Sequence, residues 1–194
     1  ISVEPDIKGF IQINGEITPK DVYDVIYGGV GKREPVEIPK LTERRIQYYR
    51  NTALENGTFY ESGNFPNRIS GVVFADDNVK ITGGEIRGSG ILFVNGDFEI
   101  GGNASIRSNK DEIILVISTG RVKIHGEKKL ECVFFTPHDI NVKGNFNLHG
   151  GVIAKNISGN GNLTIHSIED IQDKLPDDSI GDFETYIDVL SLKY

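Results

Sequence analysis

The sequence predicts a mainly β protein, a parallel β-solenoid (β-helix) of about five coils with three short strands in each coil. Three observations support this fold: an apolar segment that recurs about every nineteen residues, an alternating segment that follows it and ends in glycine, and outward charges that agree with stacked coils. A period this short indicates a solenoid, because each repeat buries its apolar side only by stacking on its neighbours. The apolar segments begin at Val72, Ile91, Ile114, Val133 and Val152.

The first strand of each coil is apolar at every position. In an alignment based on these segments, the equivalent central residues are Phe74, Phe93, Val116, Phe135 and Ala154. A strand with one face in water alternates apolar and polar residues, whereas a continuous apolar run implies burial on both faces. We therefore expect the outer face of this sheet to be covered, and a segment of the same chain is a simpler cover than a partner protein.

The second strand of each coil alternates apolar and polar residues and ends in glycine, as at residues 79–83 and 140–144. The period of two points the apolar residues inward and the polar residues outward. Stacked coils then give an outward ladder whose neighbours are opposite in charge or neutral, which favours this alignment. Its members are Lys80, Glu99, Lys123 and Asn141. The third strands give a second outward ladder, whose members are Arg87, Arg107, Glu131, His149 and His166.

A helix at residues 41–57 is the first candidate for the covering element. Thr42 is a suitable N-cap residue, and Gly57 suits the position that follows the last turn. The apolar face of this helix is expected to contain Ile46, Tyr49 and Leu54. The second candidate is the C-terminal tail, where residues 168–175 form a weak helix stopped by Pro176.

We predict that residues 1–194 form a single domain. It consists of an N-terminal extension (1–68) with a helix at about 42–56, the solenoid (69–166), and a C-terminal cap or tail (167–194). Within the extension, residues 7–17 alternate like a further strand, residues 21–27 are ambiguous between helix and loop, and residues 28–39 resemble a loop. Both ends of a solenoid need caps, because the terminal coils otherwise expose open strand edges.

Composition narrows the range of partners. The formal net charge of −7 argues against a nucleic-acid backbone as the main partner. No apolar run approaches the twenty or so residues that span a membrane. The single Cys132 excludes an internal disulfide and is expected to be a small buried residue. The chain begins at Ile1 and contains no Met, so we expect a processed or truncated polypeptide whose signal peptide or membrane helix would lie upstream.

No residue is predicted to be catalytic, to bind a cofactor or to bind a metal ion. The acid pairs Asp76/Asp77 and Asp177/Asp178 fall in expected turns. A paired-acid site would need carboxylates at equivalent outward positions of successive coils, and the sequence has none there. The Asp/Asn turns at 76–78 and 95–97 could hold calcium, but they lack the Gly-Gly-x-Gly-x-Asp signature of calcium-binding repeats.

The histidine pair His149 and His166 is the remaining candidate for a metal site. The two residues are equivalent in adjacent coils, and Glu131 lies one coil below. Two imidazoles could bind zinc or copper, but tetrahedral zinc needs more ligands than this ladder offers. A solvent-facing ladder is therefore the favoured interpretation.

Three segments carry a family resemblance: IQYYRNTALENG at residues 46–57, GVVFAD at 71–76, and LHGGVIAKNISGNGNLTI at 148–165. Over about residues 40–166 the chain resembles a bacterial domain of PilX-type pilus assembly proteins, the minor-pilin-like proteins of type IV pilus systems. Those proteins carry an N-terminal hydrophobic helix that inserts in the membrane or the pilus core, and here it would lie upstream. The resemblance implies an extracellular or cell-surface, non-enzymatic role in pilus assembly or adhesion. Its implied partners are other pilus or cell-envelope proteins and host or glycan ligands.

Two alternatives remain open. Bactofilins, which are bacterial cytoskeletal polymers, also build solenoids from short glycine-terminated repeats, but they lack a helix like that at residues 41–57 and a long tail. A carbohydrate-binding or carbohydrate-processing β-helix protein is the other alternative. Its candidate sugar contacts are Phe59, Tyr60 and Phe65, for which a core or cap contact is the simpler role.

Overall fold

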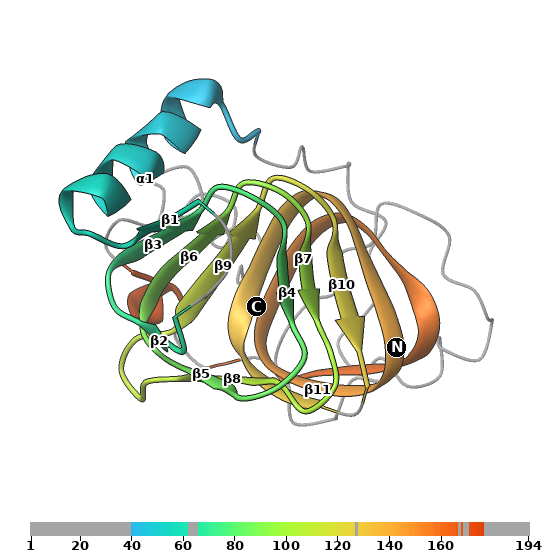
Figure 1. Cartoon of the computed structure of the whole chain (residues 1–194). Helices are drawn as coiled ribbons and strands as arrows, with labels where there is room; N and C mark the ends of the chain where they lie inside the picture. Colours follow the sequence, from blue (N-terminus) through green and yellow to red (C-terminus); the bar gives the residue numbers. More distant parts are fainter. Residues whose placement is uncertain (1–39, 62–65, 127, 167, 169–170, 177–194) are drawn as a thin grey trace, which may run out of the picture.

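A computed structural model describes residues 40–61, 66–126, 128–166, 168 and 171–176, and it confirms the parallel β-solenoid of about five coils (Figure 1). The chain starts with helix α1 (Glu43–Glu55), continues through the coils, and reaches the 3₁₀ helix η2 (Ile171–Lys174). The elements predicted within residues 1–39, and any structure of the tail after Pro176, lie outside the described residues.

The strands are short up to β10 and then merge into one continuous strand that winds through the last coils. Their bounds are β1 (Phe59–Tyr60), β2 (Arg68–Ile69), β3 (Val72–Ala75), β4 (Val79–Ile81), β5 (Glu85–Gly88), β6 (Gly90–Val94), β7 (Phe98–Ile100), β8 (Ser105–Ser108), β9 (Ile114–Ser118), β10 (Val122–His125) and β11 (Lys128–His166).

The strands stack into three parallel sheets, which form three faces of the solenoid. The first face contains β1, β3, β6, β9 and residues 132–135 of β11. The second face contains β4, β7, β10 and residues 140–143 of β11. The third face contains β2, β5, β8 and the part of β11 around Leu130. In Figure 1, β3, β6 and β9 run side by side, as do β4, β7 and β10.

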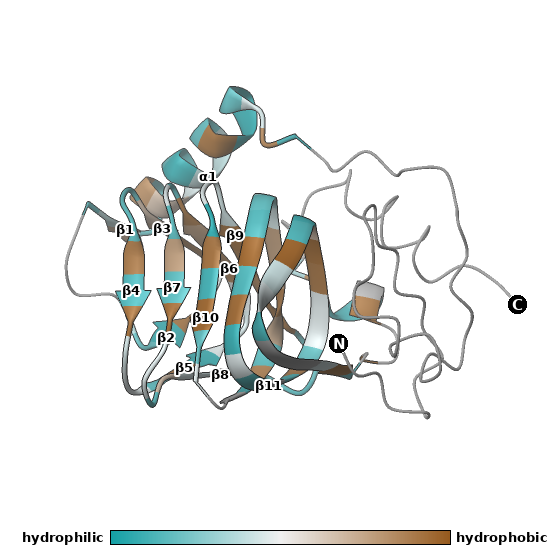
Figure 2. Cartoon of the chain, turned by 90° about the vertical axis from the view of Figure 1, so that its right-hand side faces the viewer, coloured by the Kyte–Doolittle hydropathy of each residue, from teal (hydrophilic) through white to brown (hydrophobic). Residues whose placement is uncertain are grey.

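The interior of the solenoid is an apolar core to which all three faces contribute. Val73 and Leu92 enter it from the first face, Phe98 from the second and Ile106 from the third. Phe134 and Phe98 meet across this interior with their ring centroids 6.1 Å apart. The alternation predicted for the second strands places their apolar residues here, and hydrophobic strand segments alternate with hydrophilic turns in Figure 2.

The first face is buried on both sides, as its continuous apolar strands predict. Its outward side chains form a second apolar cluster against α1, with Tyr49 centred 5.2 Å from Phe93 and Phe93 stacked on Phe74 at 4.9 Å. Figure 1 shows α1 lying against the end of this face formed by β1 and β3. The cover is thus part of the chain itself.

The buried side of α1 differs from the predicted one. Tyr49 and Ala53 are buried and Ile46 packs against the same cluster, whereas Leu54 is 50% exposed. The prediction for Leu54 was therefore wrong. A step of four residues from Tyr49 returns to the same side of a helix, and a step of five residues leaves it.

The caps of α1 explain where it begins and ends. The carbonyl of Thr42 accepts hydrogen bonds from the Arg45 and Ile46 N–H groups, although its hydroxyl makes no capping bond. At the other end, Gly57 has a φ of +68°, and its N–H donates to the Leu54 carbonyl. The Thr58 N–H donates to the Ala53 carbonyl at 2.8 Å, which completes a Schellman motif.

The tail also covers the first face, but not as the weak helix predicted at residues 168–175. In the part of this segment that the structure describes, residues 168 and 171–175, only η2 is helical, and it forms a 3₁₀ turn. The Ile113 N–H donates to the Lys174 carbonyl at 2.7 Å, and Leu175 joins the outer apolar cluster. Residues 171–175 are therefore called the tail strap, because they are bonded to the backbone of the third coil at Ile113 and pack on the outer apolar cluster.

The alignment of the third coil was wrong by one residue. Phe93 pairs with Ile117 rather than Val116, and Ile117 pairs with Phe135. Val116 consequently points into the interior core, and in the fifth coil Ala154, which was aligned with the outward Phe135, also packs against the interior, while Ile153 packs on the outer cluster. The apolar run at 114–117 has no alternation that could fix its register, and a slip of one residue exchanges the two sides of a strand.

Candidate functional site

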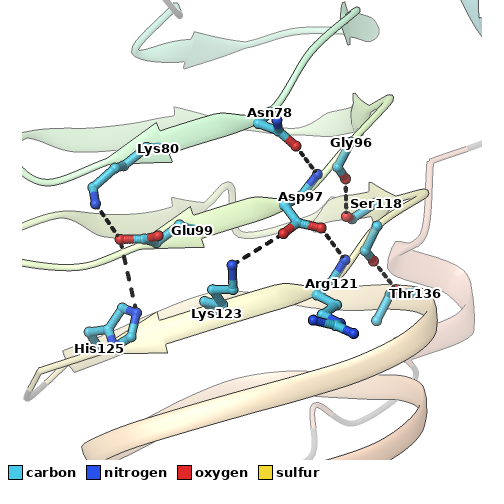
Figure 3. A network of polar contacts seen from close by, with 11 residues as sticks. Asn78, Lys80, Gly96, Asp97, Glu99, Ser118, Arg121, Lys123, His125 and Thr136 are labelled. Atoms are coloured by element: carbon cyan, nitrogen blue, oxygen red, sulfur yellow. Dashed lines mark hydrogen bonds and ion pairs between the residues drawn. The ribbon is translucent and has the colours of Figure 1, made fainter.

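The second face carries a network of ion pairs between neighbouring coils (Figure 3). The predicted ladder is confirmed: Lys80 pairs with Glu99, Glu99 with Lys123, and Lys123 with Asn141. The Lys80 Nζ lies 2.7 Å from a Glu99 carboxylate oxygen, and the Lys123 Nζ lies 3.2 Å from Asp97. Lys80 and Lys123 thus each have a carboxylate partner in a neighbouring coil.

Both carboxylates of this network are held in their ionised form. The Arg121 backbone N–H donates to Asp97 and, together with Lys123, lowers the pKa of Asp97 despite its partial burial. The Lys80 ammonium donates to Glu99 and lowers its pKa, and the charges of His125 and Lys123 act in the same direction. Neither carboxyl is held protonated as a general acid at neutral pH would be.

The corner between the first and second faces is a stack of side-chain hydrogen bonds. The Asn95 amide donates to the Asp76 carboxylate at 2.8 Å, and the Thr119 hydroxyl bonds Asn95 at 3.3 Å. The Asn78 side-chain oxygen accepts from the Asp97 N–H at 2.7 Å. Apart from Thr119, these residues belong to the turns considered for calcium. Their oxygens instead tie successive coils together.

The third face carries a column of three arginines, Arg68, Arg87 and Arg107, which pair in register on β2, β5 and β8. All three side chains are exposed. Glu85 bonds the Arg87 guanidinium and lies 3.4 Å from that of Arg107. The predicted ladder began at Arg87, and sequence reasoning missed both Arg68 and the bridging Glu85. The signal for Arg68 was its position nineteen residues before Arg87, one coil period.

A shallow hollow of about 260 Å³ adjoins this column. Its polar lining consists of Glu85, Asn103, Ser105, Arg107, Lys129 and Glu131. Lys129 and Glu131, two residues apart on β11, form an ion pair at 3.5 Å within this lining. The hollow is smaller than the usual pocket for a small-molecule ligand, and it is lined by charged and hydrogen-bonding groups.

The structure brings His149 and His166 together as the alignment predicts. Their rings stack with centroids 4.4 Å apart and an angle of 16° between the planes. Within the described residues, no group of three or more His, Cys, Asp or Glu side chains could share a metal ion.

The other predicted positions have structural roles where they are described. Cys132 is fully buried in the interior core, and burial raises the pKa of its thiol. Phe59 stacks on Phe74 at 5.6 Å and lies under the Arg50 guanidinium, while Tyr60 packs against the interior. Phe65, Asp177 and Asp178 lie outside the described residues.

One family model matches the part of the chain that contains α1, the solenoid and η2. Residues 42–174 match a domain of unknown function, DUF7305. The chain belongs to this family. The match begins at the N-cap of α1 and ends in η2, so the DUF7305 domain includes both segments that cover the first face. No curated protein and no solved structure matches the chain. Among the described residues, no helix is long and apolar enough to cross a membrane.

Proposed function

We propose that this DUF7305 protein is a non-enzymatic structural or adhesion module at the outside of a bacterial cell, associated with type IV pilus assembly as a minor-pilin-like ectodomain. Its partners would be other pilus or cell-envelope proteins, and an upstream helix would anchor it. The observation that carries this proposal is the self-contained solenoid: the chain's own α1 and tail strap cover its apolar first face.

A covered solenoid suits display better than end-to-end polymerisation. The opening coil begins with the two-residue strands β1 and β2 and the three-residue strand β4, whose central residue Lys80 is exposed. Short edge strands that carry lysine resist addition of a further strand. The α1 helix packs beside β1 and β3 at this same end.

The polar chemistry of the second face supports a structural role. Asp97 and Glu99 each bond cations or backbone groups of neighbouring coils, and their pKa values are lowered. Such groups stabilise the stack of coils and are poor proton donors at neutral pH. The sequence resemblance over residues 40–166 supplies the pilus association.

The experiment that tests this proposal locates the full-length protein in its source organism. Immunogold labelling and cell fractionation should find it at the cell surface, and deletion of its gene should reduce the number of pili or the adhesion of the cells. Complementation with a variant carrying Ala53→Gln, which disrupts the cover of the first face, should fail, whereas Leu54→Gln should restore the phenotype. Cytoplasmic filaments would instead favour the bactofilin-like alternative, and a soluble cytoplasmic protein would overturn the proposal.

A further inference from the structure

The arginine column, defined as Arg68, Arg87 and Arg107, carries more positive charge than the single carboxylate bonded to it, that of Glu85, can neutralise. Residues in register on adjacent parallel strands lie about 4.8 Å apart, and like charges placed opposite each other are unfavourable. Glu85 is shared by Arg87 and Arg107. Among the residues that the structure describes, no carboxylate lies within ion-pair distance of Arg68. Three guanidinium groups therefore face water with Glu85 as their bridging carboxylate, and Glu131, which follows Arg107 on the next coil, is paired with Lys129.

The other two faces differ from this one. The first face is covered by α1 and the tail strap. On the second face, Lys80 and Lys123 each have a carboxylate partner in a neighbouring coil. The positive column also stands out in a chain whose net charge is −7. A local cationic stripe on an acidic protein attracts a polyanion to one surface only.

We propose that the third face binds a linear acidic polysaccharide whose carboxylates pair with the arginine column along the solenoid axis. Guanidinium groups bind carboxylates through paired hydrogen bonds, and the fixed stacking of the coils sets their spacing without cost at the time of binding. The adjoining hollow adds groups that can hydrogen-bond with sugar hydroxyls. They are the Asn103 amide and the Ser105 hydroxyl, which can donate and accept, and the Lys129 ammonium, which donates.

The composition of the third face favours a polysaccharide over single-stranded nucleic acid. Proteins that bind single strands stack bases on aromatic side chains. Strands β2, β5 and β8 contain no aromatic residue. A regular polymer of carboxylated sugars needs no such platform, because its recognition uses charge and hydrogen bonds.

This inference names a ligand class for the adhesion role and in that respect rests on the proposed function. Its test uses purified protein and needs no pili, so the two can fail separately. A protein that binds no polyuronate but lies at the cell surface would overturn the ligand alone. A protein that binds polyuronate but forms cytoplasmic filaments would overturn the surface role alone.

The test is calorimetric titration of the full chain with polygalacturonate, with neutral dextran as the control polymer. We expect binding to polygalacturonate that weakens with added salt, and none to dextran. The triple variant Arg68→Gln, Arg87→Gln, Arg107→Gln should lose about tenfold or more in affinity. The matched variant Lys80→Gln, Lys123→Gln removes two cations from the second face and should change affinity less than about twofold, because each of those lysines has a carboxylate of its own, whereas the three arginines have only Glu85.

A gain of affinity provides a second, independent readout. Glu85→Gln removes the carboxylate that competes for Arg87 and Arg107, so it should strengthen binding about twofold to fivefold. Circular dichroism would check that each variant is folded. Equal losses in the third-face and second-face variants, no gain with Glu85→Gln, or tighter binding of single-stranded DNA or polyglutamate than of polygalacturonate would each overturn the proposal.

Discussion

At the scale of single residues, the solenoid depends on places where two backbones come closer than any side chain allows. Gly88 is buried and has a φ of +128°, and a Cβ there would lie 1.9 Å from the Ile69 carbonyl oxygen of the neighbouring coil. The oxygen belongs to backbone and has little room to move. Only glycine fits at this corner, because the neighbouring coil leaves no room for a side chain and because the backbone has a positive φ.

Replacing Gly88 by alanine should lower the free energy of unfolding by about 2 kcal/mol, through overpacking against the Ile69 carbonyl. Gly83→Ala is the matched control. Gly83 is exposed, and a Cβ there meets nothing within 4 Å, so its effect should stay within about 0.5 kcal/mol. Urea denaturation of both variants measures the difference. Equal stability of the two would contradict the close approach of the coils.

The lowered pKa of Asp97 makes the free energy of unfolding depend on pH. Its pKa in the folded protein is lowered, chiefly by the Arg121 backbone hydrogen bond, so folding is favoured more strongly when the carboxyl is ionised. This stabilisation is complete well above the ordinary value of 3.8 and is lost as the pH falls through that value and below. Asp97→Asn should be less stable than the wild type at pH 7, and the difference should shrink towards pH 3.

Thermal melting of the wild type and of Asp97→Asn between pH 7 and pH 3 would measure this effect. Replacement of the exposed Glu61 by glutamine tests the removal of a charge alone, and the stability difference of that variant should stay near zero. A difference between Asp97→Asn and the wild type that grows on acidification would contradict the assigned role of Asp97.

At the scale of elements, α1 acts as a cover rather than as an independent helix. Its stability comes from packing Tyr49 and Ala53 on the first face, because an isolated helix of 13 residues is marginal in water. The tail strap completes the cover near Ile113. The stability of α1 therefore depends on the outer apolar cluster.

Ala53→Gln should destabilise the protein by about 2 kcal/mol or more, because a long polar side chain must enter a fully buried site. Leu54→Gln, one residue further along the same helix, should have an effect within about 0.5 kcal/mol, since Leu54 is half exposed. The measurement is chemical denaturation together with binding of a hydrophobic dye. Equal effects of the two substitutions would contradict the observed orientation of α1.

At the scale of the whole molecule, the three faces differ in chemical character: one is apolar and covered, one is crossed by ion pairs between coils, and one carries the arginine column. The short opening strands protect the described end of the stack. Size-exclusion chromatography with light scattering should give a monodisperse monomer, and negative-stain images should show no filaments. Long filaments would mean that coils of separate molecules pair end to end.

Sequence reasoning predicted the architecture well and the side-chain assignments less well. The second-strand ladder from Lys80 to Asn141 was predicted correctly, because alternating residues fix both register and side. The third coil was misaligned at Val116, because the apolar run at 114–117 does not show which of its residues face inward. Leu54 was assigned to the wrong side of α1, because the adjacent Ala53 and Leu54 are both apolar and the sequence does not show which of them is buried. Arg68 was missed, since its neighbour Ile69 follows it whereas Ile86 precedes Arg87.

The sequence by itself determined that this chain is a β-solenoid with a covered sheet, because a short apolar period and continuous apolar strands depend only on local composition. The tertiary structure alone decided which atoms meet between coils: the Ile69 carbonyl below Gly88, the Glu85 bridge between two arginines, and the strap bonded to Ile113. Apart from the Glu85–Arg87 bond within β5, these contacts join residues about one coil or more apart in the sequence. Their partners are set by the register of stacking, which a pattern within one coil does not contain.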